Sequence, residues 1–446
     1  FIAAHTRWRK MILHPLTYFL ASSILLQYPL VNEARLGSSR KAFKVKLRKE
    51  HARDSNGTGH DHGRGFFVGA LRLGGPNPQE LQVVYSTTTG MVSLPSSDCT
   101  SAACTEHHSY APARSESSED INADGSRVDP AGGRRALPGQ RRDTAKIGFY
   151  TTGTENSTGL EGVFVRDTVC LGDHVDIPGS RDPACASVAL LTATTVQEAT
   201  FRARPSDGMV GLGLPGQSIN PGFNMLSCLS ADGLRPHFGF WVSDDAHEAE
   251  LTFGGHDKER LAADLEWTPV AVPEKGHWMI DIVGIRVGDK KLDVCTNKKG
   301  CRGLLDTSSP GITVPSDMSK ELLELTKAIE GTGCKLPNLS FEFRGGIVLT
   351  LTVEDYAGPQ CEAEIRTHHI QDDMLGAPLF MLGEPFFRAY YTVFDWGFFN
   401  LGFGKVKSPR SCQRLVAAGL PADPATCIGP IDHVRDEIFL MEESHQ

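Results

Sequence analysis

Two short, similar stretches, one in each half of the chain, constrain its fold more than any other feature. VVYSTTTGMVSLPS occupies residues 83–96, and GLLDTSSPGITVPS occupies residues 303–316. Each joins an apolar run to a small, hydroxyl-rich loop and reaches Pro-Ser a few residues later. They are the one repeat we find, and they read as the two halves of a single site. The first half has Ser86 where the second half has Asp306.

The rest of the chain favours an all-β architecture with a few short helices. From Phe66 to about Val406, strand-length segments alternate with turns that are rich in Gly and Pro. Hydrophobic residues make up 40% and charged residues 22% of the 446 residues, which is enough for a large buried core in one bilobal unit. The net charge is −9 without a clustered basic face, so nucleic acid is not expected as a partner.

The N-terminal region indicates a secretory protein. Residues 1–34, in which Met11 is a candidate start, contain basic residues followed by the mostly apolar run 16–26. This run is short for a membrane span, so we expect a signal peptide and no transmembrane segment after its removal; an uncleaved anchor helix is the alternative. Residues 35–65 then form a basic tail, 41–51, and a Gly/His linker.

Cysteines and glycosylation sequons agree with an oxidising compartment. Local spacing suggests four pairs and a weaker fifth, with Cys228 left over. The candidates are Cys99–Cys104, Cys295–Cys301, Cys334–Cys361, Cys412–Cys427 and, as the fifth, Cys170–Cys185, and the sequons begin at Asn56, Asn156 and Asn338. No residue pattern predicts a cofactor or a metal site.

Seven ordered motifs between Phe66 and Val406 together resemble the pepsin-like (A1) aspartic protease family. The most specific is MLGEPFFRAYYTVFDWGFFNLGFGKV, from Met381. The others are FFVGALRLGGPNPQELQVVY from Phe66, the Cys99–Cys104 loop, GFYTTGTENSTG from Gly148, DGMVGLGLPG from Asp207, LTFGGHD from Leu251 and HWMIDIVGIRVGDKKLDVC from His277.

This resemblance implies a bilobal acid-protease fold with a cleft between two β lobes. The N-terminal lobe would be 66–262, the C-terminal lobe 263–406 and a C-terminal extension 407–446. Within the first lobe, residues 112–143 are rich in Ser, Arg, Gly, Asp and Pro, and we expect a mobile insertion there. A flap with Tyr150 and Thr151 would cross the cleft.

The resemblance also assigns roles to the two loops. Ser86 and Asp306 would occupy the two catalytic positions, and the hydroxyls of Thr87 and Thr307 would cross-link the loops. Gly211 and Gly383 match glycines that lie behind each loop. Thr88 and Ser308 stand where the family has glycine, so their side chains would crowd the cleft floor.

The loss of one acid predicts the loss of catalysis. An aspartic protease needs two carboxylates that share one proton, and a serine hydroxyl does not ionise in that range. Asp306 alone should titrate like an ordinary aspartate. An alternative register would place the first acid at Asp98, although Asp98 lies beside Cys99 with no Thr-Gly after it.

We therefore expect a secreted, non-catalytic, protease-like glycoprotein that binds a peptide or protein, or that acts as a subunit of a larger assembly. The alternative is a divergent endopeptidase with residual activity at acid pH through Asp306. A Ser-His-Asp hydrolase is disfavoured, because the chain has no Gly-x-Ser-x-Gly elbow.

Overall fold

The computed structural model confirms the all-β class. It describes residues 40–53, 60–129, 131–149, 158–175, 182–296, 300–327, 334–358, 360–369 and 376–407. Within these ranges the longest helices, α3 (Met225–Ala231) and α4 (Ser319–Leu325), have 7 residues each. The other helices are α1 (Ala102–Thr105), α2 (Glu198–Ala203), α5 (Val353–Tyr356), α6 (Glu384–Ala389) and the 3-10 turns η1 (Pro112–Arg114), η2 (Pro215–Gln217), η3 (Pro221–Phe223), η4 (Lys258–Arg260) and η5 (Pro273–Lys275).

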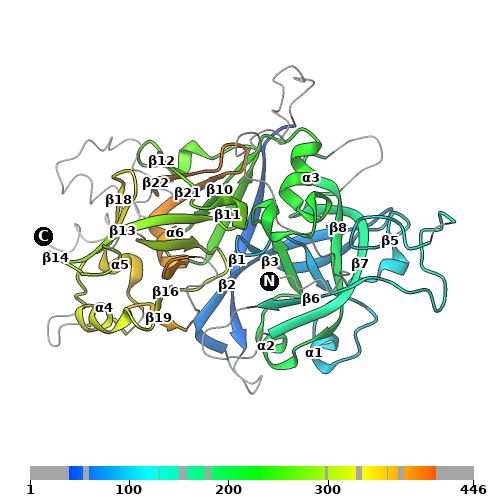
Figure 1. Ribbon diagram of the computed structural model, residues 1–446, viewed down its shortest axis with the longest axis horizontal. Helices are drawn as coiled ribbons and strands as arrows, with labels where there is room; N and C mark the ends of the chain where they lie inside the picture. Colours follow the sequence, from blue (N-terminus) through cyan, green and yellow to red (C-terminus); the bar gives the residue numbers. More distant parts are fainter. Residues whose placement is uncertain are drawn as a thin grey trace, which may run out of the picture.

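The described strands form two sheets, the larger of which has 14 strands and runs through both halves of the molecule (Figure 1). Its order is β12 (Glu266–Pro269), β22 (Asn400–Lys405), β21 (Tyr390–Asp395), β10 (His237–Val242), β11 (Glu248–Phe253), β1 (Phe43–Arg53), β2 (His60–Leu73), β3 (Gln79–Ser86), β9 (Gly208–Gly211), β4 (Ser93–Pro95), β8 (Cys185–Val196), β7 (Thr158–Leu171) and β5 (Glu119–Ile121), with β6 (Thr144–Phe149) on β7.

The second sheet has 8 strands and belongs to the C-terminal half. Its order is β18 (Val348–Leu351), β17 (Leu339–Phe343), β13 (Met279–Val287), β15 (Cys301–Leu305), β20 (Leu379–Leu382), β16 (Ile312–Pro315) and β19 (Ile365–His368), with β14 (Lys290–Lys291) on β13. In Figure 1, β5, β7 and β8 lie on one side of the molecule and β13, β14 and β18 on the other, with β1 and β2 between them.

The two halves repeat one arrangement of four strands. In the first half the order is β3-β9-β4-β8, and in the second it is β15-β20-β16-β19. The first pair of each set is parallel, the second antiparallel and the third parallel. Because β3 leads into the Ser86 loop and β15 leads into the Asp306 loop, the repeat places the two loops in equivalent positions.

The structure corrects the expectation that the chain before Phe66 is a tail and a linker. β1 lies inside the large sheet, paired with β11 on one side and with β2 on the other. Phe43, Val45 and Leu47 are buried in the core. Alternating apolar and basic residues were the available signal, since a strand with one buried face shows this period of two. The basic charges of the segment obscured this alternation.

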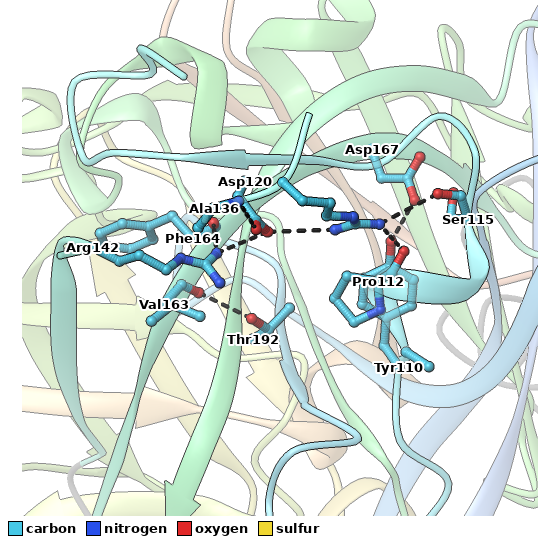
Figure 2. Close-up of polar contacts among 12 residues, drawn as sticks. Tyr110, Pro112, Ser115, Asp120, Ala136, Arg142, Val163, Phe164, Asp167 and Thr192 are labelled. Atoms are coloured by element: carbon cyan, nitrogen blue, oxygen red, sulfur yellow. Dashed lines mark hydrogen bonds and ion pairs between the residues drawn. The ribbon is translucent and has the colours of Figure 1, made fainter. Parts of the chain in front are cut away.

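Residues 112–143 also differ from the expected mobile insertion, because their described part contains packed structure. Asp120 in β5 is buried and accepts a 3.0 Å hydrogen bond from Arg142 and a 2.8 Å bond from the backbone N–H of Ala136 (Figure 2). Arg135 adds a second contact to the same carboxylate at 3.4 Å. A buried charge needs such partners, so these arginines fold the segment onto β7 although its composition is polar.

Four of the expected disulfides are present: Cys99–Cys104, Cys170–Cys185, Cys295–Cys301 and Cys334–Cys361. Cys228 is a free thiol. The pair Cys412–Cys427 and the signal region 1–34 lie outside the described residues. None of the helices that the structure does describe is long and apolar enough to span a bilayer.

Candidate functional site: two loops at the cleft floor

The structure brings the Ser86 and Asp306 loops together through two threonines. The Thr87 hydroxyl donates to the Leu305 carbonyl at 2.6 Å and accepts from the Thr307 N–H at 3.1 Å. The Thr307 hydroxyl donates to the Tyr85 carbonyl at 2.7 Å and accepts from the Thr87 N–H at 3.2 Å. Both threonines are buried. This reciprocal set of neutral bonds joins the loops and does not depend on either catalytic position.

A chain of hydroxyl groups connects Ser86 to Asp306. The Ser308 hydroxyl donates to Asp306 Oδ1 at 2.6 Å, and the Ser308 N–H donates to the same oxygen at 2.9 Å. Ser86 Oγ lies 3.0 Å from Ser308 Oγ and 2.9 Å from Thr88 Oγ1. Each hydroxyl has one hydrogen to donate, so Thr88 donates to Ser86, Ser86 to Ser308, and Ser308 to the carboxylate.

These hydrogen bonds give Thr88 and Ser308 a role beyond the expected crowding of the cleft floor. Ser86 is fully buried, and its hydroxyl contacts other hydroxyls instead of reaching the Asp306 carboxyl directly. Ser308 therefore stands between the two catalytic positions. Its side chain would be absent if the residue were glycine, so the link between the positions depends on this substitution.

The titration expected for Asp306 needs correction. Burial raises its pKa above the usual value, while the hydrogen bonds from Ser308 and the charge of Arg204 act in the opposite direction. Asp306 keeps some exposed surface, but many protein atoms surround its carboxyl and remove water from it. Desolvation disfavours the charged form. Loss of the second acid therefore does not return Asp306 to ordinary behaviour.

Arg204 is a charged neighbour of Asp306 that the sequence motifs did not indicate. It follows α2, and burial lowers its pKa while the charge of Asp306 raises it. The available signal was its position, three residues before Asp207 in the DGMVGLG motif. None of the seven motifs requires a basic residue there.

Gly211 and Gly383 lie directly behind the two loops. A methyl group at Gly211 would overlap with the backbone of Thr89 and Met91, and one at Gly383 would overlap with the backbone of Ser309 and Gly311. In each half a glycine at the end of a neighbouring strand, β9 or β20, therefore allows the backbone there to approach the loop closely.

The remaining predicted residues fall in three groups. Tyr150, Thr151, Asn56 and Asn156 lie outside the described residues. Asn338 is exposed immediately before β17. Asp98 is also exposed and lies away from the threonine cross-link, so the alternative register loses its support. Among the described residues there is no group of three or more His, Cys, Asp or Glu side chains that could hold a metal ion.

Comparison with known proteins agrees with this geometry. The sequence profile of the eukaryotic aspartyl protease family matches residues 138–406. Cathepsin E of Aquarana catesbeiana is 27% identical over 76% of this chain and 79% of its own length. Cathepsin E of Mus musculus is 29% identical over 74% and 78%, and gastricsin of Cavia porcellus is 27% identical over 76% and 79%.

Proposed function

Because the chain belongs to the eukaryotic aspartyl protease family, we propose that it is a non-catalytic member whose cleft binds a peptide or protein without cutting it. One observation carries this proposal: the first catalytic position holds the buried Ser86, which reaches Asp306 only through the Ser308 hydroxyl. Aspartic protease chemistry needs an ionised carboxylate to take a proton from water while a protonated one polarises the substrate carbonyl. Ser86 supplies neither.

The expected cost of this substitution is large. A positioned acid or base contributes about 10²–10⁴-fold to a rate, and removing one member of a unit that acts together can cost as much as removing all of it. The intact threonine cross-link supports a cleft that persists without catalysis. Retention of the framework favours a binding or structural role, either alone or within a larger assembly.

A second candidate is residual endopeptidase activity at acid pH. The raised pKa of Asp306 favours it, because a carboxyl that keeps its proton in mild acid can donate a hydrogen bond to a substrate carbonyl. The weakness of this candidate is the missing base, since the hydrogen bonds that the described residues make to the side chains of Ser86 and Asp306 come from hydroxyl and backbone N–H groups and not from a second carboxyl.

The lobes and the cellular location belong to the same proposal. We assign 66–262 and 263–406 to the two lobes, with β1 as a strand of the sheet that both share. The candidate signal region 1–34, the disulfides and the exposed Asn338 sequon support a secreted or lumenal glycoprotein. The relatives named cathepsin E and gastricsin match over 76% of this chain, and we propose that it shares their scaffold alone.

The test compares the native chain with a variant in which the acid is restored. The native protein, incubated with an unfolded protein at pH 3–6, should give no cleavage products. The triple variant Ser86→Asp, Thr88→Gly, Ser308→Gly should gain cleavage in the same assay. The matched control is the triple variant Ser86→Asn, Thr88→Gly, Ser308→Gly. Asparagine has the shape of aspartate but no acid, so this variant should stay inactive.

The opposite results would decide for the second candidate. Cleavage by the native chain that disappears in Asp306→Asn would establish residual activity and overturn the non-catalytic assignment. Binding is measured separately, as the anisotropy of fluorescent, unstructured peptides added to the native chain. If the unsubstituted protein is folded, as shown by its melting profile, but neither binds nor cleaves any peptide, the cleft is not a peptide site and only a structural role remains.

A further inference from the structure

Hydrogen bonds join the two proposed lobes at a place where neither catalytic position takes part. One side of this joint is the segment from β9 into η2, and the other is the segment from η5 into β13. The Leu214 N–H donates to the Gly276 carbonyl at 2.9 Å, and the Trp278 indole N–H donates to the Leu212 carbonyl at 2.8 Å. The joint therefore fixes the position of one lobe relative to the other.

The joint also supports both loops of the cleft floor. The Leu212 N–H donates to the Ser86 carbonyl at 2.7 Å, and the Leu305 N–H donates to the Trp278 carbonyl at 3.0 Å. Leu305 is the last residue before the remaining acid. A change in the joint therefore reaches both catalytic positions through single hydrogen bonds.

One side-chain contact across the joint depends on the protonation of a histidine. Gln217 Nε2 lies 2.7 Å from the Lys275 carbonyl oxygen and 2.9 Å from His277 Nε2. A carbonyl only accepts, so the NH₂ group of Gln217 faces it and donates its second hydrogen to His277. His277 Nε2 is therefore the unprotonated nitrogen, and the neutral ring carries its hydrogen on Nδ1.

The protonated ring of His277 would lack an acceptor at both nitrogens. His277 is half-buried, and its Nδ1 is enclosed by protein atoms with no hydrogen-bond partner among the described residues. An N–H at Nε2 would face the NH₂ group of Gln217. Rotation of that amide would turn its carbonyl toward the Lys275 carbonyl instead. Either arrangement loses one of the two hydrogen bonds of Gln217.

The surroundings of His277 also disfavour its positive charge. Burial lowers the pKa of His277 to about 4, and the charge of Lys275 acts in the same direction. Glu274 is the one carboxylate on η5, and its side chain is exposed. The segments that lie against η5 and Gln217, which are residues 270–273, η2 and the loop 86–92, carry no titratable side chain.

We propose that the contact between Gln217 and His277 is an acid-sensitive connection between the lobes, intact when His277 is neutral and weakened when the ring takes up a proton. The folded chain holds this proton more weakly than the unfolded chain, in which histidine titrates near pH 6.5. The contribution of the connection to stability is therefore complete above about pH 6.5 and is lost as the pH falls toward 4. The inference goes beyond the proposed function, because it does not require the cleft to bind a ligand.

Hydrogen exchange of the full chain at pH 7 and pH 4.5, followed by mass spectrometry, measures the opening of the joint. The Leu214 N–H is the reporter, since it donates across the joint, and exchange times are scaled for the chemical effect of pH on exchange. On this scale, exchange of Leu214 in the peptide 212–218 should be about tenfold faster at pH 4.5. A peptide within β13 should not change.

Two variants separate the titration of His277 from other effects of acid. His277→Gln keeps a side-chain acceptor for Gln217 without a titrating ring, so the acceleration at pH 4.5 should disappear. Gln217→Glu offers the protonated ring a carboxylate, so exchange should become slower in mild acid and the pKa of His277, measured by NMR, should rise. The matched control is His237→Gln. His237 is also half-buried with a pKa lowered by burial, but it lies in β10 opposite Asp395, so this variant should keep the native acceleration.

Melting profiles at pH 7 establish that each variant is folded. Equal scaled exchange at pH 7 and pH 4.5 in the native chain would overturn the inference, as would an acceleration that persists in His277→Gln. If His277→Gln does not fold, Gln217→Glu decides alone, since unchanged acceleration in that variant contradicts the connection. Peptide binding at neutral pH is measured independently, so a failure here leaves the proposed function standing.

Discussion

The Ser86 loop and the Asp306 loop are held by the same contacts, but only the second ends in a carboxylate. In each loop a buried threonine donates to a carbonyl of the opposite loop and accepts an N–H from it. In each, a glycine behind the loop leaves no space for a methyl group. The two loops differ at one catalytic position, where the first has Ser86 and the second has Asp306. Asp306 is the remaining acid, and burial raises its pKa.

This difference teaches that the framework of the site does not require its chemistry. The cross-link uses neutral groups and buried backbone, so an acid can be lost at one position without releasing a loop. The free energy that holds the loops together comes from satisfied hydrogen bonds and close backbone packing. Substitutions in the shared framework should therefore have larger effects on stability than substitutions at the unlike positions.

The largest effect is expected at the glycines behind the loops. Gly211→Ala and Gly383→Ala should each lower the free energy of unfolding by about 3 kcal/mol, because the added methyl meets backbone atoms that no rotamer change can move. Chemical denaturation measures the loss. The control is Gly255→Ala, a buried glycine where the methyl finds ordinary contacts of 3.5 Å, and it should change little. A large loss at only one of the two sites would show that the halves are not equivalent.

The threonine cross-link should give the next largest effect. Thr87→Val and Thr307→Val each leave one buried carbonyl and one buried N–H unpaired, so each should cost roughly 2–3 kcal/mol. Because the two residues bond to each other's loop, the double variant should cost less than the sum. Thr105→Val is the control, because Thr105 is exposed and its hydroxyl bonds to the carbonyl of Ala102 in its own helix. Additive losses would argue against a reciprocal unit.

Ser308→Ala tests the hydroxyl chain at the point where the loops differ. The substitution removes the hydroxyl that donates to Asp306 at 2.6 Å. The free energy of unfolding should therefore fall by about 1–2 kcal/mol, and the pKa of Asp306 should rise further. The loss of stability should be present at neutral pH and should shrink in acid, where Asp306 is already protonated. Denaturation of native and variant chains from pH 4 to 7 measures both. A loss that is independent of pH would mean that Ser308 acts by packing alone.

The smallest effect is a gain of stability in Asp306→Asn. The folded chain holds the Asp306 proton more tightly than the unfolded chain does, so ionised Asp306 costs folding free energy above its raised pKa. Asparagine keeps the acceptor for Ser308 without the charge. The variant should be more stable at pH 7 by up to about 1 kcal/mol, and the advantage should vanish as the pH falls toward the ordinary aspartate value of about 3.9. A variant less stable at pH 7 would contradict the burial effect.

Local patterns predicted the loops and the fold class but not the contacts made across the chain. Ser86, Thr87, Asp306 and Thr307 were readable because each follows an apolar strand in the same short motif. The position of Ser308 between the two catalytic positions was not readable, because it depends on how two distant loops face each other. The raised pKa of Asp306 was missed for the same reason, since desolvation comes from packing.

In two segments the composition pointed away from the folded structure. The charges of residues 41–51 suggested a tail, although Val45 and Leu47 alternate with them as a strand requires. The polar residues of 112–143 suggested mobility, because the pattern did not show that Arg135 and Arg142 would share the buried Asp120. A polar segment can pack when its charges are matched inside the fold.

The place of β1 decides where this protein can be trimmed for laboratory production. The strand pairs on both sides, and Lys49 reaches across to the buried Glu384 at 2.8 Å, just behind the Asp306 loop. A recombinant version that began at Phe66 would expose the unpaired edges of β2 and β11 in the middle of the sheet. It would also remove Lys49, the nearer cation of the buried Glu384, and leave only Arg388 at 3.8 Å. Such a product should precipitate, so expression needs to retain the residues from Arg40 onward.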